Sequence, residues 1–242
     1  MLILLNMNIY KKSIVAAVII IIVLIEVLVA GSKNFVYAST LNYSMTTNNN
    51  IVMLDVPFTS QAPYGNWADL RQEDGCEEAT AVMAMSWVNN KLLTRSRALS
   101  EILAISNFEQ LKYKNYHDTS ARDTVDRIFK GYYGYKKVTV KYDINSTDIK
   151  YELKKGNLVI VPVNGQKIHN PYFKQPGPEH HKLVIKGFDY NTKEYITNDP
   201  GTRRGNGFRY KESVLVNAIS DYPTGNHISV KYSRKAMIIV SK

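Results

Sequence analysis

The chain has 242 residues, of which 45% are hydrophobic, a formal net charge of +10 and one cysteine. A lone cysteine excludes a disulfide within the chain and the usual structural zinc sites, which need four cysteines or two with two histidines. The basic residues are scattered rather than clustered, and residues 1–38 hold three lysines and one glutamate, which leaves +8 for the rest. We expect no nucleic-acid partner, and a surface attracted to acidic peptides or to the polyanions of a cell envelope.

The N-terminal segment has the features of an export signal. Lys11 and Lys12 precede an apolar run over residues 13–30, which approaches the roughly 20 residues needed to cross a bilayer. Val36-Tyr37-Ala38 follows, so residues 1–38 are predicted to be a signal peptide cleaved after Ala38 or, alternatively, an uncleaved signal anchor. In both cases the remaining chain is expected outside the cytoplasm, either secreted or anchored to the cell membrane by the N-terminal helix.

The chain after residue 38 is predicted to form a linker and one domain. Residues 39–50 are rich in Ser, Thr and Asn and predict a flexible linker, which leaves residues 51–242 for the domain. A short strand is predicted over residues 52–58. Helices are then predicted from Cys76, over residues 99–111, and from Ser120, where a capping-box-like pattern occurs.

Strands are predicted to dominate the second half. Runs rich in β-branched residues predict strands over residues 138–142, 158–163, 182–188, 195–198 and 236–240. A helix is predicted to begin near Ser146 or Thr147 and to end at Lys154-Lys155-Gly156. A helical half followed by an antiparallel half indicates an α+β fold with a groove between the halves. Residues 164–179, with three prolines and two glycines, are predicted to be a loop over that groove.

Cys76 is the first candidate for chemistry. It lies in Asp74-Gly75-Cys76, where a polar turn runs into an apolar stretch. A thiol in the first turn of a helix faces unsatisfied amides and the positive end of the helix dipole, and both stabilise thiolate. We therefore expect a nucleophile, and the alternative is a small buried hydrophobic side chain.

The strand region contains candidates for a histidine base and for the carboxylate that would orient it. His180 and His181 stand where the loop enters a strand, which is a rigid mount for a base. Pairing Asp189 with Glu194 across the next turn would bring Asp199 beside His181. Taken alone, Asp199 is more typical of a turn signal, but with a thiol and an imidazole present it favours the orienting member of a triad. The remaining histidines are expected at the surface: His117, His169 and His227.

Four motifs in order resemble those of papain-fold cysteine peptidases similar to the bacteriocin-processing, double-glycine leader peptidases. They are Val56-Pro57-Phe58-Thr59-Ser60-Gln61, Asp74-Gly75-Cys76-Glu77-Glu78-Ala79, the strand from His181 to Asp189, and Asn198-Asp199-Pro200-Gly201. The resemblance covers about residues 52–240. It implies a papain-like fold in which the helix that carries the thiol faces an antiparallel barrel that carries the base.

The resemblance also implies catalytic roles. Cys76 would be the nucleophile, His181 the general base and acid, and Asp199 the group that orients the imidazole. Gln61 would donate to the oxyanion, with Gln72 as a nearer competitor on the same loop.

Three functions remain open at this stage. The first is an exported or membrane-anchored peptidase acting on a peptide or protein substrate through a Cys-His-Asp triad. The second is a cell-wall peptide amidase that uses the same triad, and the third is an inactive, peptide-binding module on this scaffold. We expect a monomer with no cofactor and no metal, because the histidines lack the spacing of two ligands on one helix face.

Overall fold

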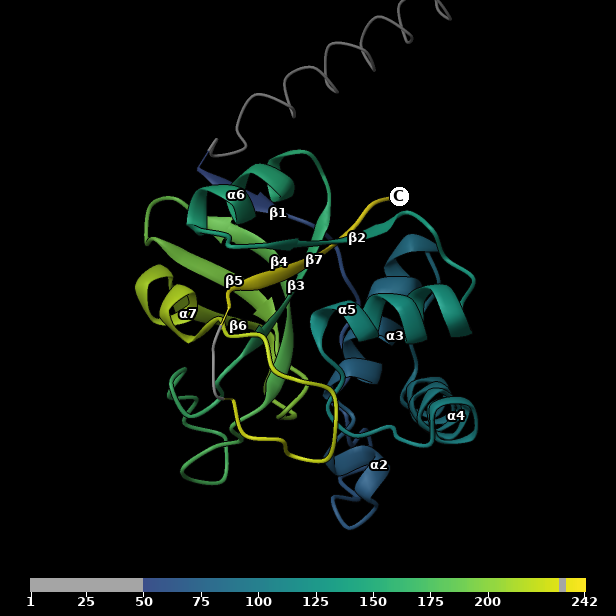
Figure 1. Ribbon diagram of the computed structural model, residues 1–242. Helices are drawn as coiled ribbons and strands as arrows, with labels where there is room; N and C mark the ends of the chain where they lie inside the picture. Colours follow the sequence, from purple (N-terminus) through teal and green to yellow (C-terminus); the bar gives the residue numbers. More distant parts are fainter. Residues whose placement is uncertain (1–49, 231–233) are drawn as a thin grey trace, which may run out of the picture. The chain divides into compact units, whose positions relative to one another are not determined.

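The computed structural model describes residues 50–230 and 234–242 (Figure 1). The predictions for residues 1–38 and for the linker up to residue 49 lie outside this part. Asn50–Lys242 form one compact unit. Within the described residues, no helix combines the length and the apolar character needed to cross a membrane.

The first half of the unit is helical. Its elements are α2 (Leu70–Glu73), α3 (Cys76–Val88), α4 (Arg95–Tyr113), α5 (Ala121–Asp123) and the π-helical turns η1 (Thr124–Tyr132). Helix α3 is buried from Cys76 to Trp87 and contacts α4, η1 and the sheet. A helix that is apolar on all sides has to be covered on all sides, so α3 forms the centre of the helical half.

The second half is built around an antiparallel sheet. Its strands are β1 (Ile51–Met53), β2 (Val138–Tyr142), β3 (Leu158–Val163), β4 (His181–Asp189), β5 (Glu194–Asn198), β6 (Asn206–Lys211) and β7 (Ala236–Val240). In the described part of the chain these seven strands have the order β2-β7-β3-β4-β5-β6, with β1 also paired to β4. Helices α6 (Ser146–Lys154) and α7 (Glu212–Ala218) complete the domain.

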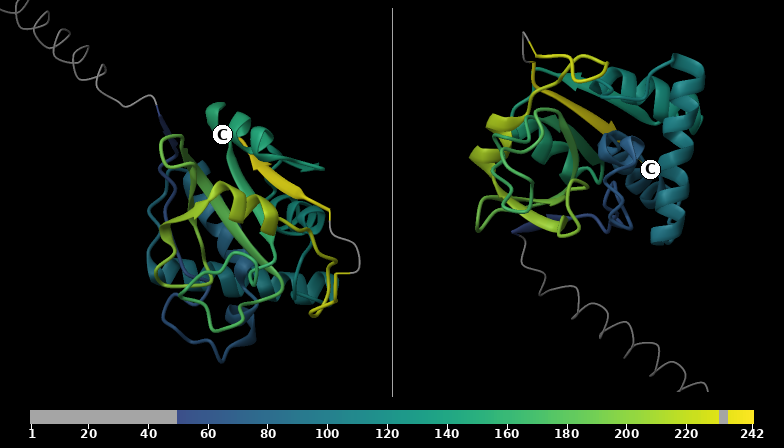
Figure 2. Two further views of the ribbon diagram at one scale, coloured as in Figure 1. Left: turned by 90° about the vertical axis from the view of Figure 1, so that its left-hand side faces the viewer. Right: turned by 90° about the horizontal axis from the view of Figure 1, so that it is seen from below.

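The sheet separates two apolar clusters. Alternate residues of β4 point to opposite faces, so Val184 packs in the cluster with α3, α4 and η1, and Leu183 packs in the cluster with α6 and α7. Figures 1 and 2 show the same arrangement, with α3, α4 and α5 on one side of the sheet and α7 on the other. This sheet and its helical half confirm the predicted α+β class.

The register between β4 and β5 places the predicted base beside the predicted carboxylate. Asp189 pairs with Glu194, as predicted from the turn, but a bulge between Ile185 and Gly187 shifts the pairing by one residue. A Cβ at Gly187 would lie 2.5 Å from the carbonyl oxygen of Val52, so only glycine lets β1 approach here. After the bulge, Asn198 lies opposite Val184, which leads the end of β5 towards the start of β4.

Most predicted elements coincide with observed ones. Strands β2, β3 and β7 have the predicted bounds, and α3 begins at Cys76. The prediction of a strand over residues 52–58 is wrong beyond Met53, because Val56 N bonds back to Leu54 O and Pro57 has no N–H to donate. Sequence patterns also missed β6, which alternates few apolar residues with polar ones, and α7, which is only seven residues long.

Candidate active site

His181 and Asp199 form a buried pair at the ends of β4 and β5. His181 Nε2 lies 2.8 Å from Asp199 Oδ1, and the side chains are 2% and 0% exposed. Because Nε2 hydrogen-bonds the carboxylate, Nδ1 is the nitrogen of the imidazole that remains available for another partner. A carboxylate that fixes one ring nitrogen sets the tautomer and leaves the other nitrogen to act as a base.

Four donors satisfy the Asp199 carboxylate. Oδ1 accepts from His181 and from Gly201 N, and Oδ2 accepts from the Tyr210 hydroxyl at 2.6 Å and Asn170 Nδ2 at 3.1 Å. Burial raises the pKa of Asp199, but the His181 charge and the hydrogen bonds from His181, Tyr210 and Gly201 outweigh it, so the pKa lies below its usual value. Burial and the adjacent charge raise the pKa of Tyr210, which keeps it a donor. The carboxylate is thus ionised and locked in place.

The ring of His181 is also held by packing. Phe173, from the predicted loop over residues 164–179, contacts the ring edge to face with centroids 5.3 Å apart. A Cβ at Gly201 would lie 2.8 Å from Phe173 Cε1 and 3.0 Å from His181 Cε1. Glycine is therefore required where the Asp199 turn passes the imidazole. Sequence reasoning missed Asn170, Phe173 and Tyr210, since each reaches the pair from a distant segment.

Gln61 connects the pair to the segment before Cys76. Its backbone N donates to Pro200 O at 2.9 Å, next to Asp199, and its Nε2 donates to Glu73 O at 2.5 Å. The side chain is buried, and its Oε1 has no hydrogen-bond partner among the described residues. Gln72 is also buried, and its Oε1 likewise has no hydrogen-bond partner among the described residues. Gln61 is thus the glutamine with contacts on both sides of the proposed site.

Cys76 begins α3 directly after a tight turn. A Cβ at Gly75 would lie 2.6 Å from Arg71 O, so the close approach of α2 to this turn requires glycine. The Cys76 side chain is buried, and Sγ donates to Glu77 Oε2 at 3.0 Å. Burial, the charge of Glu77 and the hydrogen bond to it raise the pKa of the thiol well above its usual value, with a smaller opposing effect of Lys182.

This environment corrects one expectation from the sequence. The helix start was expected to lower the thiol pKa, but desolvation and the adjacent Glu77 carboxylate exceed that effect. The same carboxylate accepts from the Tyr222 hydroxyl at 2.6 Å and lies 3.7 Å from Lys182 Nζ. In the resting protein, Cys76 is therefore a protonated thiol held in a buried polar network.

The structure does not join the thiol directly to the imidazole. Within residues 50–230 and 234–242, Sγ hydrogen-bonds Glu77 and does not hydrogen-bond His181. His181 lies on the β4 face of Leu183, while Lys182 lies on the face that packs against α3 and reaches Glu77. Among the described residues, the pairing of His181 with Asp199 is thus present at rest, and a hydrogen bond between Cys76 and His181 is not.

Comparison with known proteins shows which family the chain belongs to. A crystal structure of a protein assigned as a C39-like peptidase from Bacillus anthracis matches with a TM-score of 0.51 and 14% identity, covering 80% of this chain and 99% of that chain. This likeness shows the fold, and it agrees with the papain-like resemblance read from the four motifs. No curated protein matches. The Peptidase_C39 like family matches residues 53–223, and the chain therefore belongs to that family.

Proposed function

We propose that the domain is a cysteine peptidase that hydrolyses peptide bonds through Cys76, His181 and Asp199. The observation that carries the proposal is the buried His181–Asp199 pair at 2.8 Å, with its carboxylate kept ionised by four donors. Membership of a C39-like peptidase family supports the same reaction class.

The proposed reaction assigns the following steps to these residues. His181 accepts the thiol proton, the sulfur forms a bond to the peptide carbonyl carbon, and the oxyanion receives hydrogen bonds from Gln61 Nε2 and the backbone amide of Cys76. His181 then gives the proton to the leaving amine as the C–N bond breaks. Water, deprotonated by His181, hydrolyses the thioester and restores the thiol. Asp199 stabilises the imidazolium throughout.

Substrate binding must change two contacts, and Cys76 Sγ must come within reach of His181, for this sequence to occur. Cys76 Sγ has to leave Glu77 Oε2, and Gln61 Nε2 has to leave Glu73 O. We propose that the peptide itself causes both changes, so that the thiol becomes reactive only when a substrate carbonyl is in place. The resting thiol would then be protected from unspecific chemistry.

Intact-protein mass spectrometry tests the assignment. The parent protein is expected to form a single adduct with an epoxide inhibitor of thiol peptidases and to cleave a casein-type substrate. Cys76→Ala is expected to lose both while keeping its circular dichroism spectrum, and His181→Ala to lose cleavage. Cleavage by Cys76→Ala at the parent rate would refute the assignment.

The resting thiol favours a second candidate, an inactive peptide-binding module. Its high pKa and its bond to Glu77 are what an unused cysteine would show. Failure of the epoxide to react, together with retention of peptide binding by Cys76→Ala, would support this module over the enzyme.

The charge of the chain favours a third candidate, a cell-wall peptide amidase. A net charge of +8 beyond residue 38 would hold the domain against an anionic wall. Digestion of purified peptidoglycan beside the casein-type substrate separates amidase from peptidase.

We also propose that the domain acts outside the cytoplasm, either secreted or attached to the membrane by residues 1–38. The sequence of this segment supports the proposal. Fractionation of expressing cells, with N-terminal sequencing of the extracytoplasmic protein, tests it. A mature N-terminus at Ser39 would indicate cleavage, an intact N-terminus in the membrane fraction an anchor, and cytoplasmic protein would refute it.

A further inference from the structure

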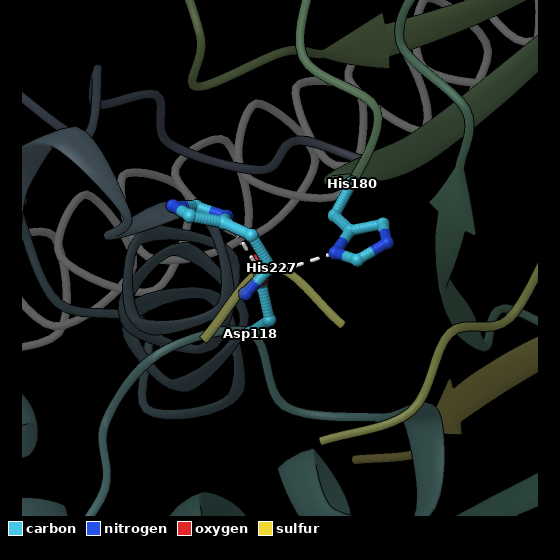
Figure 3. A group of neighbouring side chains, drawn as sticks. All are labelled: Asp118, His180 and His227. Carbon is cyan, nitrogen blue, oxygen red and sulfur yellow. Dashed lines mark hydrogen bonds and ion pairs between the residues drawn. The ribbon is translucent and has the colours of Figure 1, made fainter. Parts of the chain in front are cut away.

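A second group of ionisable side chains lies outside the His181–Asp199 pair. Asp118 Oδ2 lies 2.9 Å from His180 Nδ1 and 3.0 Å from His227 Nδ1 (Figure 3). The ligand-type atoms of the three residues all lie within 4.8 Å of one another. The Asp118 and His180 side chains are 6% and 3% exposed, and His227 is 62% exposed.

Hydrogen bonds alone do not account well for this convergence. The backbone N of His227 also donates to Asp118 Oδ2, at 2.9 Å. Two imidazole nitrogens and one amide therefore point at one carboxylate oxygen, which has two lone pairs. If a cation lay between the side chains, both imidazoles and the carboxylate would direct lone pairs at it, and the amide would remain the donor to the oxygen.

The surroundings of His227 resemble the outer shell of a metal site. Its other nitrogen, Nε2, lies 3.5 Å from Asp74 Oδ1, and Asp74 is held in turn by His117 Nδ1 at 2.5 Å. A carboxylate on the far nitrogen is the usual second-shell partner of a histidine that binds a metal. Glu73, Asp74 and His227 also converge, but that group has one imidazole and an exposed Glu73.

We propose that Asp118, His180 and His227 bind a divalent transition-metal ion of the Zn²⁺ type. Tetrahedral Zn²⁺ with ligands at about 2.0–2.1 Å separates its ligand atoms by about 3.3 Å. The two separations from Asp118 Oδ2, 2.9 and 3.0 Å, need to open by a few tenths of an ångström, and the two imidazoles, whose ligand atoms lie within 4.8 Å of each other, need to adopt the same spacing. Solvent reaches the exposed His227 side, which provides an entry path and a water molecule as fourth ligand.

The ligand set explains why spacing in the sequence did not predict the site. Asp118 follows α4, His180 precedes β4, and His227 lies in the segment before β7. No two of them share a helix face, so the arrangement exists only after folding. The inference is independent of the proposed peptidase activity, because metal binding can be measured without a substrate.

Titration calorimetry of the full chain, stripped of metal with a chelator, tests the site with Zn²⁺ as the probe. We expect one equivalent to bind, and His227→Ala and Asp118→Asn each to weaken binding at least tenfold. His169→Ala, an exposed histidine outside the group, is the matched control and is expected to bind as the parent does. His227 is mostly exposed, so its substitution keeps the test valid even if Asp118→Asn fails to fold.

Co²⁺ provides a second readout of the ligands. Two imidazoles, one carboxylate and water are expected to give visible d–d bands with no thiolate-to-cobalt charge-transfer band in the near ultraviolet. Three results would overturn the proposal: no stoichiometric Zn²⁺ binding, unchanged binding by His227→Ala, or a charge-transfer band that disappears in Cys76→Ala and so shows that the thiol is a ligand.

Discussion

His181 and Asp199 come from neighbouring antiparallel strands, and their side chains meet at 2.8 Å in a fully buried position. Two further side chains, Tyr210 and Asn170, donate to the second oxygen of the carboxylate. The imidazole can therefore neither rotate nor change its hydrogen-bonded nitrogen without leaving buried polar groups unpaired. This rigidity makes the pair the best defined part of the proposed site.

Asp199→Asn should remove the orientation of the imidazole. The amide cannot stabilise an imidazolium, and its NH₂ group would face existing donors, so the rate of inactivation by an epoxide inhibitor is expected to fall by roughly 10² to 10⁴. Tyr210→Phe, which removes one of four donors, is expected to cost about tenfold or less. Mass spectrometry of samples quenched at successive times gives both inactivation rates. Equal rates for Asp199→Asn and the parent would contradict the orienting role of Asp199.

Glu77→Gln should make the resting thiol more reactive. The substitution removes the negative charge that raises the Cys76 pKa, so the thiolate fraction at neutral pH increases. Each unit of pKa changes that fraction about tenfold, which is partly offset by the lower nucleophilicity of the more acidic thiol. We expect iodoacetamide labelling at pH 7 to become several-fold faster. The increase in labelling rate that accompanies ionisation of the thiol should occur at a lower pH than in the parent.

Glu78→Gln is the matched control for that experiment. Burial and the charges of Glu109 and Glu77 raise the Glu78 pKa well above its usual value, which favours the neutral form that glutamine mimics. The pH dependence of the iodoacetamide labelling rate of Glu78→Gln should match that of the parent. Equal profiles for Glu77→Gln and Glu78→Gln would show that Glu77 does not control the thiol.

Gly201→Ala should disturb the imidazole without changing any charge. The new methyl group would lie 2.8 Å from Phe173 Cε1 and 3.0 Å from His181 Cε1, so one ring has to move. We expect a loss of about 1–3 kcal/mol in the free energy of unfolding, as for other overpacked sites, and slower epoxide labelling. Phe173→Leu in the same chain should restore part of the labelling rate, and an unaltered rate in Gly201→Ala alone would exclude this contact as a constraint.

Glu109 should make the domain less stable as pH rises. Burial and the charge of Glu77 raise its pKa to about 8, against about 4.3 in an unfolded chain. The folded state thus keeps a proton that the unfolded state releases, so stability is full below about pH 4.3 and declines up to about pH 8. At about 1.4 kcal/mol per pKa unit, the decline is several kcal/mol at most.

Glu109→Gln tests this dependence, because the amide mimics the protonated acid. We expect urea unfolding of Glu109→Gln to give a higher free energy than the parent at pH 8 and a similar one at pH 4.5. Glu101 occupies a more exposed position on the same helix. Glu101→Gln should therefore leave the difference in unfolding free energy between pH 4.5 and pH 8 as it is in the parent. An unfolding free energy of the parent that does not fall with pH would contradict the buried acid.

Local sequence patterns were sufficient for most elements of the fold, although not for β6 and α7. The glycine before Cys76 and the apolar stretch after it located the start of α3, and the turn between Asp189 and Glu194 gave the pairing of β4 with β5. Both signals depend on residues close in sequence. The loop over residues 164–179 was located by its prolines and glycines, but the contacts of Asn170 and Phe173 with the pair were not.

The sequence by itself predicted the residues proposed for the chemistry and determined which strands bring His181 to Asp199, since turn type and strand alternation act over a few residues. Only the tertiary structure decided the state of Cys76, because Tyr222 and Lys182 reach the neighbouring Glu77 carboxylate from separate segments and burial strengthens the interactions between these groups. It also decided that His180, His227 and Asp118 converge. Desolvation and contacts between distant segments exist only in the packed chain, and no local pattern encodes them.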